Sequence, residues 1–175
     1  MAKQALRDLQ TRLAERLQAA RTQGVAASWL AVRAGAQRLL VPLSHAAEIF
    51  SWTDVQRVPY AKPWFVGVAN LRGNLCGVVD LSAFLQGAAS APRTAPAQAQ
   101  CRLIGFNPLL EANSAVLVDE LLGMRTTQAF AHSSARQAGE PEYFGHSYVD
   151  HAGELWRELN LQALSQQHAF LDIGA

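Results

Sequence analysis

The chain has 175 residues, of which 50% are hydrophobic and 17% charged, and its formal net charge is +1. This composition is sufficient for one compact core, in one or two lobes, and excludes disorder as a general description. The small net charge argues against nucleic acid as a partner, because phosphate binding needs a large excess of basic residues. No run of about 18 apolar residues occurs, and the polar start MAKQALRDLQ is unlike a secretory signal, so we expect a cytoplasmic protein without direct membrane insertion.

Residues 1–24 predict an amphipathic helix. Leucines recur at helical spacing from Leu6 to Leu17, and Gly24 ends the pattern. Basic residues outnumber acidic ones in this segment. Two interpretations stay open: a helix that docks on a partner or an anionic surface, and a helix whose leucine stripe packs against the rest of the chain.

From residue 25 onwards the pattern changes to short β-strands. Alternation around Gly35 predicts a hairpin over residues 27–43. Ser44 is expected to cap a helical turn, which leads into a connection bracketed by prolines. These elements begin the first of two halves.

Two apolar runs flank Arg72, and the Arg-Gly-Asn sequence between them predicts a tight hairpin turn. Gly73 and Asn74 both tolerate the positive φ that such a turn needs, so Arg72 is expected at or beside its tip. Asp80 is then expected to cap a short helix that ends at Gly87.

Residues 86–100 contain no large apolar side chain and predict an exposed linker between the two halves. Strand-like runs punctuated by glycines resume at residue 101, a polar loop interrupts them, and residues 160–171 predict a helix. The fold class is therefore mainly all-β, with helices at both ends.

Catalytic and metal-binding motifs are missing from the sequence. No glycine-rich phosphate loop occurs, the five histidines have no metal-ligand spacing, and the two cysteines form no CxxC pair. The stretch GHSYV at residues 145–149 resembles a nucleophile elbow until Val149, where a glycine is needed. A hydrolase that uses Ser147 stays as a remote alternative; otherwise no catalytic residue, cofactor or metal is expected.

The stretch FVGVANLRGNLCGVVDL at residues 65–81 resembles the signature GVxNLRGxxxPVVDL of CheW-like domains, the scaffold modules that couple chemoreceptors to a CheA-type histidine kinase. LLVPLSHAAEIF before it and AVLVDELLGMR after it are similar to further segments of this family. The resemblance covers about residues 27–165. The leading helix and the closing QHAFLDIGA resemble the PilI group, whose chemosensory systems regulate type IV pili and twitching motility.

This resemblance implies two small intertwined SH3-like β-barrels within a CheW-like domain at residues 25–175. The first barrel is expected at about 27–85, the linker at 86–100 and the second barrel at about 101–165. The implied function is a non-catalytic adaptor whose partners are the tip of a methyl-accepting chemoreceptor and the regulatory domain of the kinase. An alternative is a competing CheW-like regulator that binds one partner and blocks a productive array.

From its spacing alone, Arg72 would be a solvated arginine on a turn. The resemblance instead implies that it faces a partner, in a turn shaped by Asn70 and Gly73, and that Glu48 and Ile49 belong to the same receptor-facing surface. The residues that the resemblance places at partner surfaces are Glu48, Ile49, Gly67, Asn70, Leu71, Arg72, Gly73, Val118 and Asp119. Cys76 and Gly77 stand where the signature has an aliphatic residue and proline, which puts this part of the surface in doubt.

Overall fold

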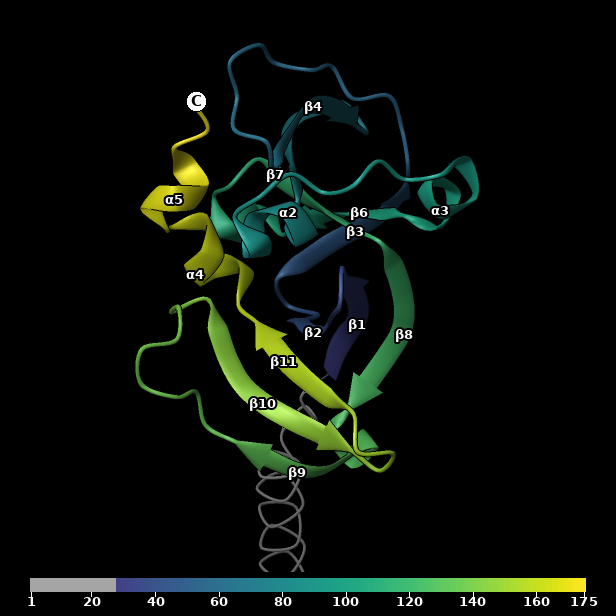
Figure 1. Cartoon of the computed structure of the whole chain (residues 1–175), viewed down its shortest axis with the longest axis vertical. Helices are drawn as coiled ribbons and strands as arrows, with labels where there is room; N and C mark the ends of the chain where they lie inside the picture. The colour runs from purple at the N-terminus through teal and green to yellow at the C-terminus, as the bar shows by residue number, and fades with distance from the viewer. Residues whose placement is uncertain (1–27) are drawn as a thin grey trace, which may run out of the picture.

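A computed structural model describes residues 28–175 of the chain. Two β-sheets lie one above the other, and short helices surround the upper sheet (Figure 1). The amphipathic helix expected at residues 1–24 lies outside the described residues. The predicted fold class, mainly β with short helices near the C-terminus, is confirmed.

The lower sheet has six strands in the order β8-β1-β2-β11-β10-β9. Their bounds are β1 Ser28–Ala34, β2 Gln37–Pro42, β8 Glu120–Thr126, β9 Phe130–Ser134, β10 Phe144–Asp150 and β11 Leu155–Leu159. The upper sheet has five strands in the order β3-β6-β7-β5-β4. Their bounds are β3 Ala46–Ser51, β4 Phe65–Leu71, β5 Asn74–Asp80, β6 Arg102–Phe106 and β7 Ser114–Val118.

The two sheets do not follow the two halves of the sequence. The hairpin β1–β2 comes from the first half but pairs with β8 on one side and, in parallel, with β11 on the other. Conversely, β6 and β7 come from the second half and complete the upper sheet, where β7 runs parallel to β5. The halves are thus intertwined by strand exchange, and the linker does not mark the boundary between the sheets.

One predicted element is wrong. The segment after Ser44 forms strand β3 and not a helical turn, and its residues alternate between half-buried and exposed. The strand pairs with β6, where Phe50 lies opposite Leu103. Pairing and burial in the tertiary structure therefore outweigh the local capping preference of Ser44.

The predicted helix after Asp80 is confirmed as α2 (Leu81–Gln86). Asp80 accepts a hydrogen bond of 3.1 Å from the backbone N–H of Ala83, and Gly87 ends the helix with a φ of +66°. The linker is exposed as expected but contains a further helix, α3 (Ala95–Gln100), capped by Thr94. Near the C-terminus, α4 (Leu161–Ser165) and α5 (His168–Leu171) take the place of the single predicted helix.

Three buried apolar clusters hold the described part of the chain together. The largest lies between the sheets, with members such as Val32 and Leu39 from the lower sheet and Val79 and Ile104 from the upper. The other two lie within the individual sheets, around Leu103 in the upper one and in the lower one around Trp29 and Trp156. No helix within residues 28–175 is long and apolar enough to cross a membrane.

Candidate functional site

The hairpin β4–β5 presents Arg72 at its tip, as the sequence predicted. Leu71 pairs with Asn74, so the turn consists of Arg72 and Gly73, with φ values of +49° and +86°. Two consecutive positive φ values are typical of the type I′ turn that matches the twist of a hairpin. The sequence assigned the positive φ values to Gly73 and Asn74; the structure assigns them to Arg72 and Gly73, and Asn74 begins β5.

Asn70 stabilises this turn from the preceding strand. Its Oδ1 accepts a hydrogen bond of 2.7 Å from the backbone N–H of Gly73. A side chain that hydrogen-bonds to the backbone three residues ahead stabilises a turn even when no partner protein is bound. The expected roles of Asn70 and Gly73 in shaping the turn therefore agree with the geometry.

Arg72 forms an ion pair with Glu48 of β3, with 2.7 Å between Nη1 and Oε1. The Arg72 side chain is 76% exposed and that of Glu48 is 35% exposed. Strands β3 and β4 are the two edges of the upper sheet. The pair therefore spans the sheet from edge to edge and joins two motifs that the sequence placed on one surface.

A cavity of about 210 Å³ lies beside this ion pair. Its lining includes Glu48, Phe50, Leu71, Arg72 and Cys76. Burial raises the pKa of the Cys76 thiol, so the thiol stays protonated and neutral near neutral pH. The site thus combines one exposed ion pair with a hollow of mixed polar and apolar lining, and this arrangement suits protein recognition.

Glu48 and Ile49 do not point to the same side of β3, although Ile49 is 39% exposed, so their expected place at a partner surface stays a prediction. Ile49 pairs with Ile104 of the cluster between the sheets, whereas Phe50 pairs with Leu103 of the upper-sheet cluster. Glu48 lines the same cavity as Phe50. Glu48 and Ile49 therefore lie on opposite sides of β3, as neighbours on a strand do.

Gly67 has a packing role that explains why no other residue fits there. Its φ is +144°, and a Cβ atom at this position would lie 2.1 Å from the backbone oxygen of Gln56. Gln56 forms two backbone hydrogen bonds with Val68, of 2.8 and 2.9 Å. Gly67 thus lets the connection before β4 approach the strand, which is a role in internal packing.

Three further residues expected at partner surfaces are not available there. Leu71 is 5% exposed and belongs to the upper-sheet core, and Val118 is fully buried between the sheets. The carboxylate of Asp119 accepts hydrogen bonds from Arg93 at 2.8 Å and from the backbone N–H of Gly35 at 2.6 Å. Burial and internal pairing therefore remove these side chains from the candidate surface.

Sequence reasoning missed the role of Arg93. Its guanidinium also lies 2.7 Å from Asp80, so it bridges two carboxylates, and its side chain is only 19% exposed. Burial alone would lower the pKa of Arg93, but hydrogen bonds and charges from Asp80 and Asp119 outweigh it and raise the pKa. The available signal was that Arg93 is the one charged residue of the segment 86–100.

The remote catalytic alternative finds no support in the geometry. Ser147 lies on β10 opposite Arg157 and Ser134, and no described histidine or carboxylate hydrogen-bonds to its hydroxyl group. His146 is its direct neighbour on the strand, so the two side chains point to opposite faces. Within residues 28–175, no three or more His, Cys, Asp or Glu side chains are grouped to hold a metal ion.

Comparisons with known proteins agree with this architecture. The CheW-like domain model matches residues 28–169. The chain is 27% identical over 151 residues to Protein PilI of Pseudomonas aeruginosa, an alignment that covers 84% of this chain and 81% of that protein. It is also 35% identical over 92 residues to the chemotaxis protein CheW of Rhizobium meliloti, covering 50% of this chain and 58% of that protein.

The fold is similar to that of a solved scaffolding protein, TtCheW from Thermoanaerobacter tengcongensis, with a TM-score of 0.65 and 12% identity. This similarity covers 83% of the chain and 96% of that structure. Two β-sheets that share strands from both halves of the chain therefore give a CheW-type fold. The chain belongs to the CheW-like domain family, and its similarity to PilI confirms the resemblance to that group.

Proposed function

We propose that this protein is a non-catalytic cytoplasmic adaptor that couples a methyl-accepting chemoreceptor to a CheA-type histidine kinase, in a chemosensory system that controls type IV pilus twitching motility. Membership of the CheW-like family supports the adaptor role, and similarity to PilI supports the pilus system. The observation that carries the proposal is the exposed Arg72–Glu48 pair beside its cavity. Array association would then arise through the receptor and the kinase.

The chemistry of Arg72 suits a contact with a protein partner. A guanidinium has five N–H donors in a planar fork and is weakly hydrated, so covering it costs less than covering an ammonium group. Glu48 holds one end of the fork and orients it, while most of the side chain stays exposed. The remaining donors are free to bind a carboxylate or the carbonyl groups at the end of a partner helix.

Reconstitution with purified partners tests this proposal. The full chain, its cognate CheA-type kinase and a cytoplasmic receptor fragment are mixed at micromolar concentration and separated by size-exclusion chromatography. We expect co-elution of all three proteins, and a weaker receptor interaction for Arg72→Glu. Absence of any complex, with each protein shown to be folded by circular dichroism, would contradict the proposal.

The same assay distinguishes the alternative in which the protein blocks array assembly. Residues 1–24 carry the basic amphipathic pattern that could occupy a partner site. A coupling adaptor lacking these residues should bind with equal or lower affinity and still form the three-protein complex. A gain in binding on deletion would favour the inhibitory regulator.

A further inference from the structure

A second groove, of about 480 Å³, lies beside the upper sheet. Its walls are the connection from β3 to β4 and the segment between α2 and α3. Large apolar side chains line it: Trp52, Val58, Phe65, Val66 and Leu117. It shares no lining residue with the cavity beside Arg72, so it is a separate candidate site.

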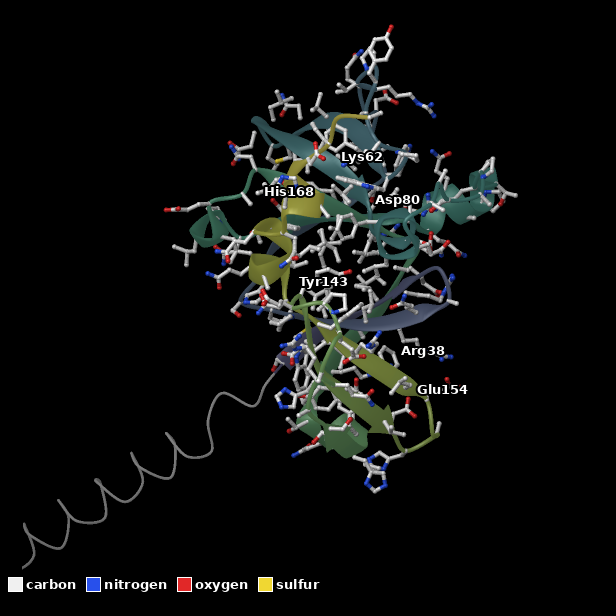
Figure 2. All side chains as sticks on the ribbon, turned by 60° about the vertical axis from the view of Figure 1, so that its left-hand side comes forward. Arg38, Lys62, Asp80, Tyr143, Glu154 and His168 are labelled. Atoms are coloured by element: carbon white, nitrogen blue, oxygen red, sulfur yellow. The ribbon has the colours of Figure 1, made fainter. Side chains whose placement is uncertain are left out.

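The charged groups of this groove leave one cation uncompensated. Arg93 is neutralised by Asp80 and Asp119, and the amine of Lys62 lies 2.7 Å from the carboxylate of Asp172. Lys62 and Asp80 are both labelled in the upper half of Figure 2. Arg57 is exposed and forms no ion pair with a residue that the structure describes. The groove therefore presents a single free guanidinium beside an apolar lining.

A polar group in the same groove also lacks a partner. The hydroxyl oxygen of Ser90 is inaccessible to solvent and has no hydrogen bond in the described part of the chain. Leaving a buried polar atom unpaired is unfavourable, so native structures seldom do so without a reason. Because this oxygen is inaccessible, a ligand in the groove would reach it only if the segment between α2 and α3 moved, so Ser90 is not counted among the ligand contacts.

Both walls are fixed before any ligand arrives. In the first wall, Lys62 donates its backbone N–H to Ile173 at 2.8 Å, and Tyr60 accepts from Ala175 at 2.8 Å. In the second wall, the ion pairs of Arg93 tie the segment between α2 and α3 to the upper sheet. A preformed groove loses little conformational entropy on binding, and this favours recognition by a short segment.

We propose that this groove binds a peptide segment of a partner protein in which an acidic side chain lies next to a large apolar one. The carboxylate would pair with the fork of Arg57, and the apolar side chain would cover the lining around Trp52 and Phe65. The chain's own basic residues 1–24 carry the wrong charge for this occupant.

Nuclear magnetic resonance of the full chain tests the proposal with two blocked peptides, acetyl-Glu-Leu-Glu-Leu-amide and its neutral counterpart acetyl-Gln-Leu-Gln-Leu-amide. We expect the acidic peptide to shift the backbone amides of Arg57, Val58 and Ser90 in a saturable way. Its affinity should exceed that of the neutral peptide roughly fivefold to tenfold, as one charge-assisted contact provides. Equal affinities, or no saturable shift at these amides, would overturn the proposal.

Three variants distinguish a contact with Arg57 from a nonspecific effect of charge. Arg57→Gln should abolish the preference for the acidic peptide, whereas Arg136→Gln, at an exposed arginine in the loop before β10, should preserve it. Arg72→Glu should also preserve it, because Arg72 lies outside this groove. The titration uses the protein alone, so its outcome is independent of whether the protein couples a receptor to a kinase.

Discussion

Arg72 and Glu48 meet at 2.7 Å although β3 and β4 are the opposite edges of the upper sheet. The sheet curls so far that the turn after β4 reaches β3, and the side chains close the barrel where backbone pairing does not. Two motifs far apart in the sequence are thereby combined into one polar site. Because this ion pair is exposed, we expect changes to it to affect partner binding more than the free energy of unfolding.

Reversing the charge of Arg72 should weaken binding more than folding. Arg72→Glu removes an exposed ion pair, so we expect the free energy of unfolding to change by less than about 1 kcal/mol. Receptor binding should fall several-fold or more, because the partner loses its guanidinium contact. Urea unfolding and calorimetric titration measure the two effects.

The reversed pair Arg72→Glu with Glu48→Arg is the matched control for that substitution. It should recover the stability of the turn but not the affinity for the receptor. Full recovery of binding would show that the partner needs only an ion pair across the barrel and not a guanidinium at residue 72.

Removing the charge of Arg93 should destabilise the fold. Arg93→Gln leaves the buried Asp80 and the half-buried Asp119 without a counter-charge. Breaking a fully buried pair costs about 3–5 kcal/mol, so we expect a loss of about 2 kcal/mol or more at this partly exposed site. Arg33→Gln is the comparison, since Arg33 pairs with Glu120 at 3.2 Å and both side chains are 41% exposed. That variant should lose less than about 1 kcal/mol in the same urea experiment. Equal losses would contradict a structural role for Arg93.

A methyl group at Gly67 should be far more costly than one at Gly73. Both residues have positive φ, but a Cβ at Gly67 meets the backbone of Gln56, while a Cβ at Gly73 meets nothing within 4 Å. Gly73→Ala should therefore lose about 1 kcal/mol from backbone strain alone. Gly67→Ala should lose clearly more, as a lower urea midpoint, and similar midpoints for both variants would argue against close packing at Gln56.

Asp150 should make the turn between β10 and β11 sensitive to acid. Its carboxylate accepts hydrogen bonds of 2.9 Å from the indole of Trp156 and from the backbone N–H groups of Glu154 and Ala152. These bonds lower the pKa of Asp150 below its ordinary 3.8. The stabilisation is therefore complete above pH 3.8 and is lost as the pH falls through the lower pKa of the folded state.

The indole N–H resonance of Trp156 reports this titration directly. It should shift with a midpoint below pH 3.8 in the natural protein, and Asp150→Asn should remove the pH dependence because the amide does not titrate. A midpoint at or above 3.8 would show that the hydrogen bonds do not favour the charged carboxylate.

Local patterns were enough to predict several elements. The hairpin at Arg72 and the helix from Asp80 to Gly87 depend on residues close together in the chain, which interact in the same way in any fold. Ser44 shows the limit: its capping preference lost to the pairing of Phe50 with Leu103, which comes from a distant strand.

In the candidate site, too, local features could be predicted from the sequence, whereas features that depend on distant strands could not. The signature around Arg72 was sufficient to assign the family and to mark this residue, because motif and turn chemistry are local properties of the sequence. The motif could not reveal that Leu71 and Val118 are buried, since burial depends on which strands exchange between the two halves.

The mainly β fold class, the turn at Arg72 and membership of the CheW-like family could all be predicted from the order of residues. The sharing of strands between the sheets, the pairing of Arg72 with Glu48 and the bridge from Arg93 to Asp80 and Asp119 became visible in the folded chain alone. Turns and caps depend on neighbouring residues, whereas ion pairs and burial arise from contacts between distant segments that no local pattern encodes.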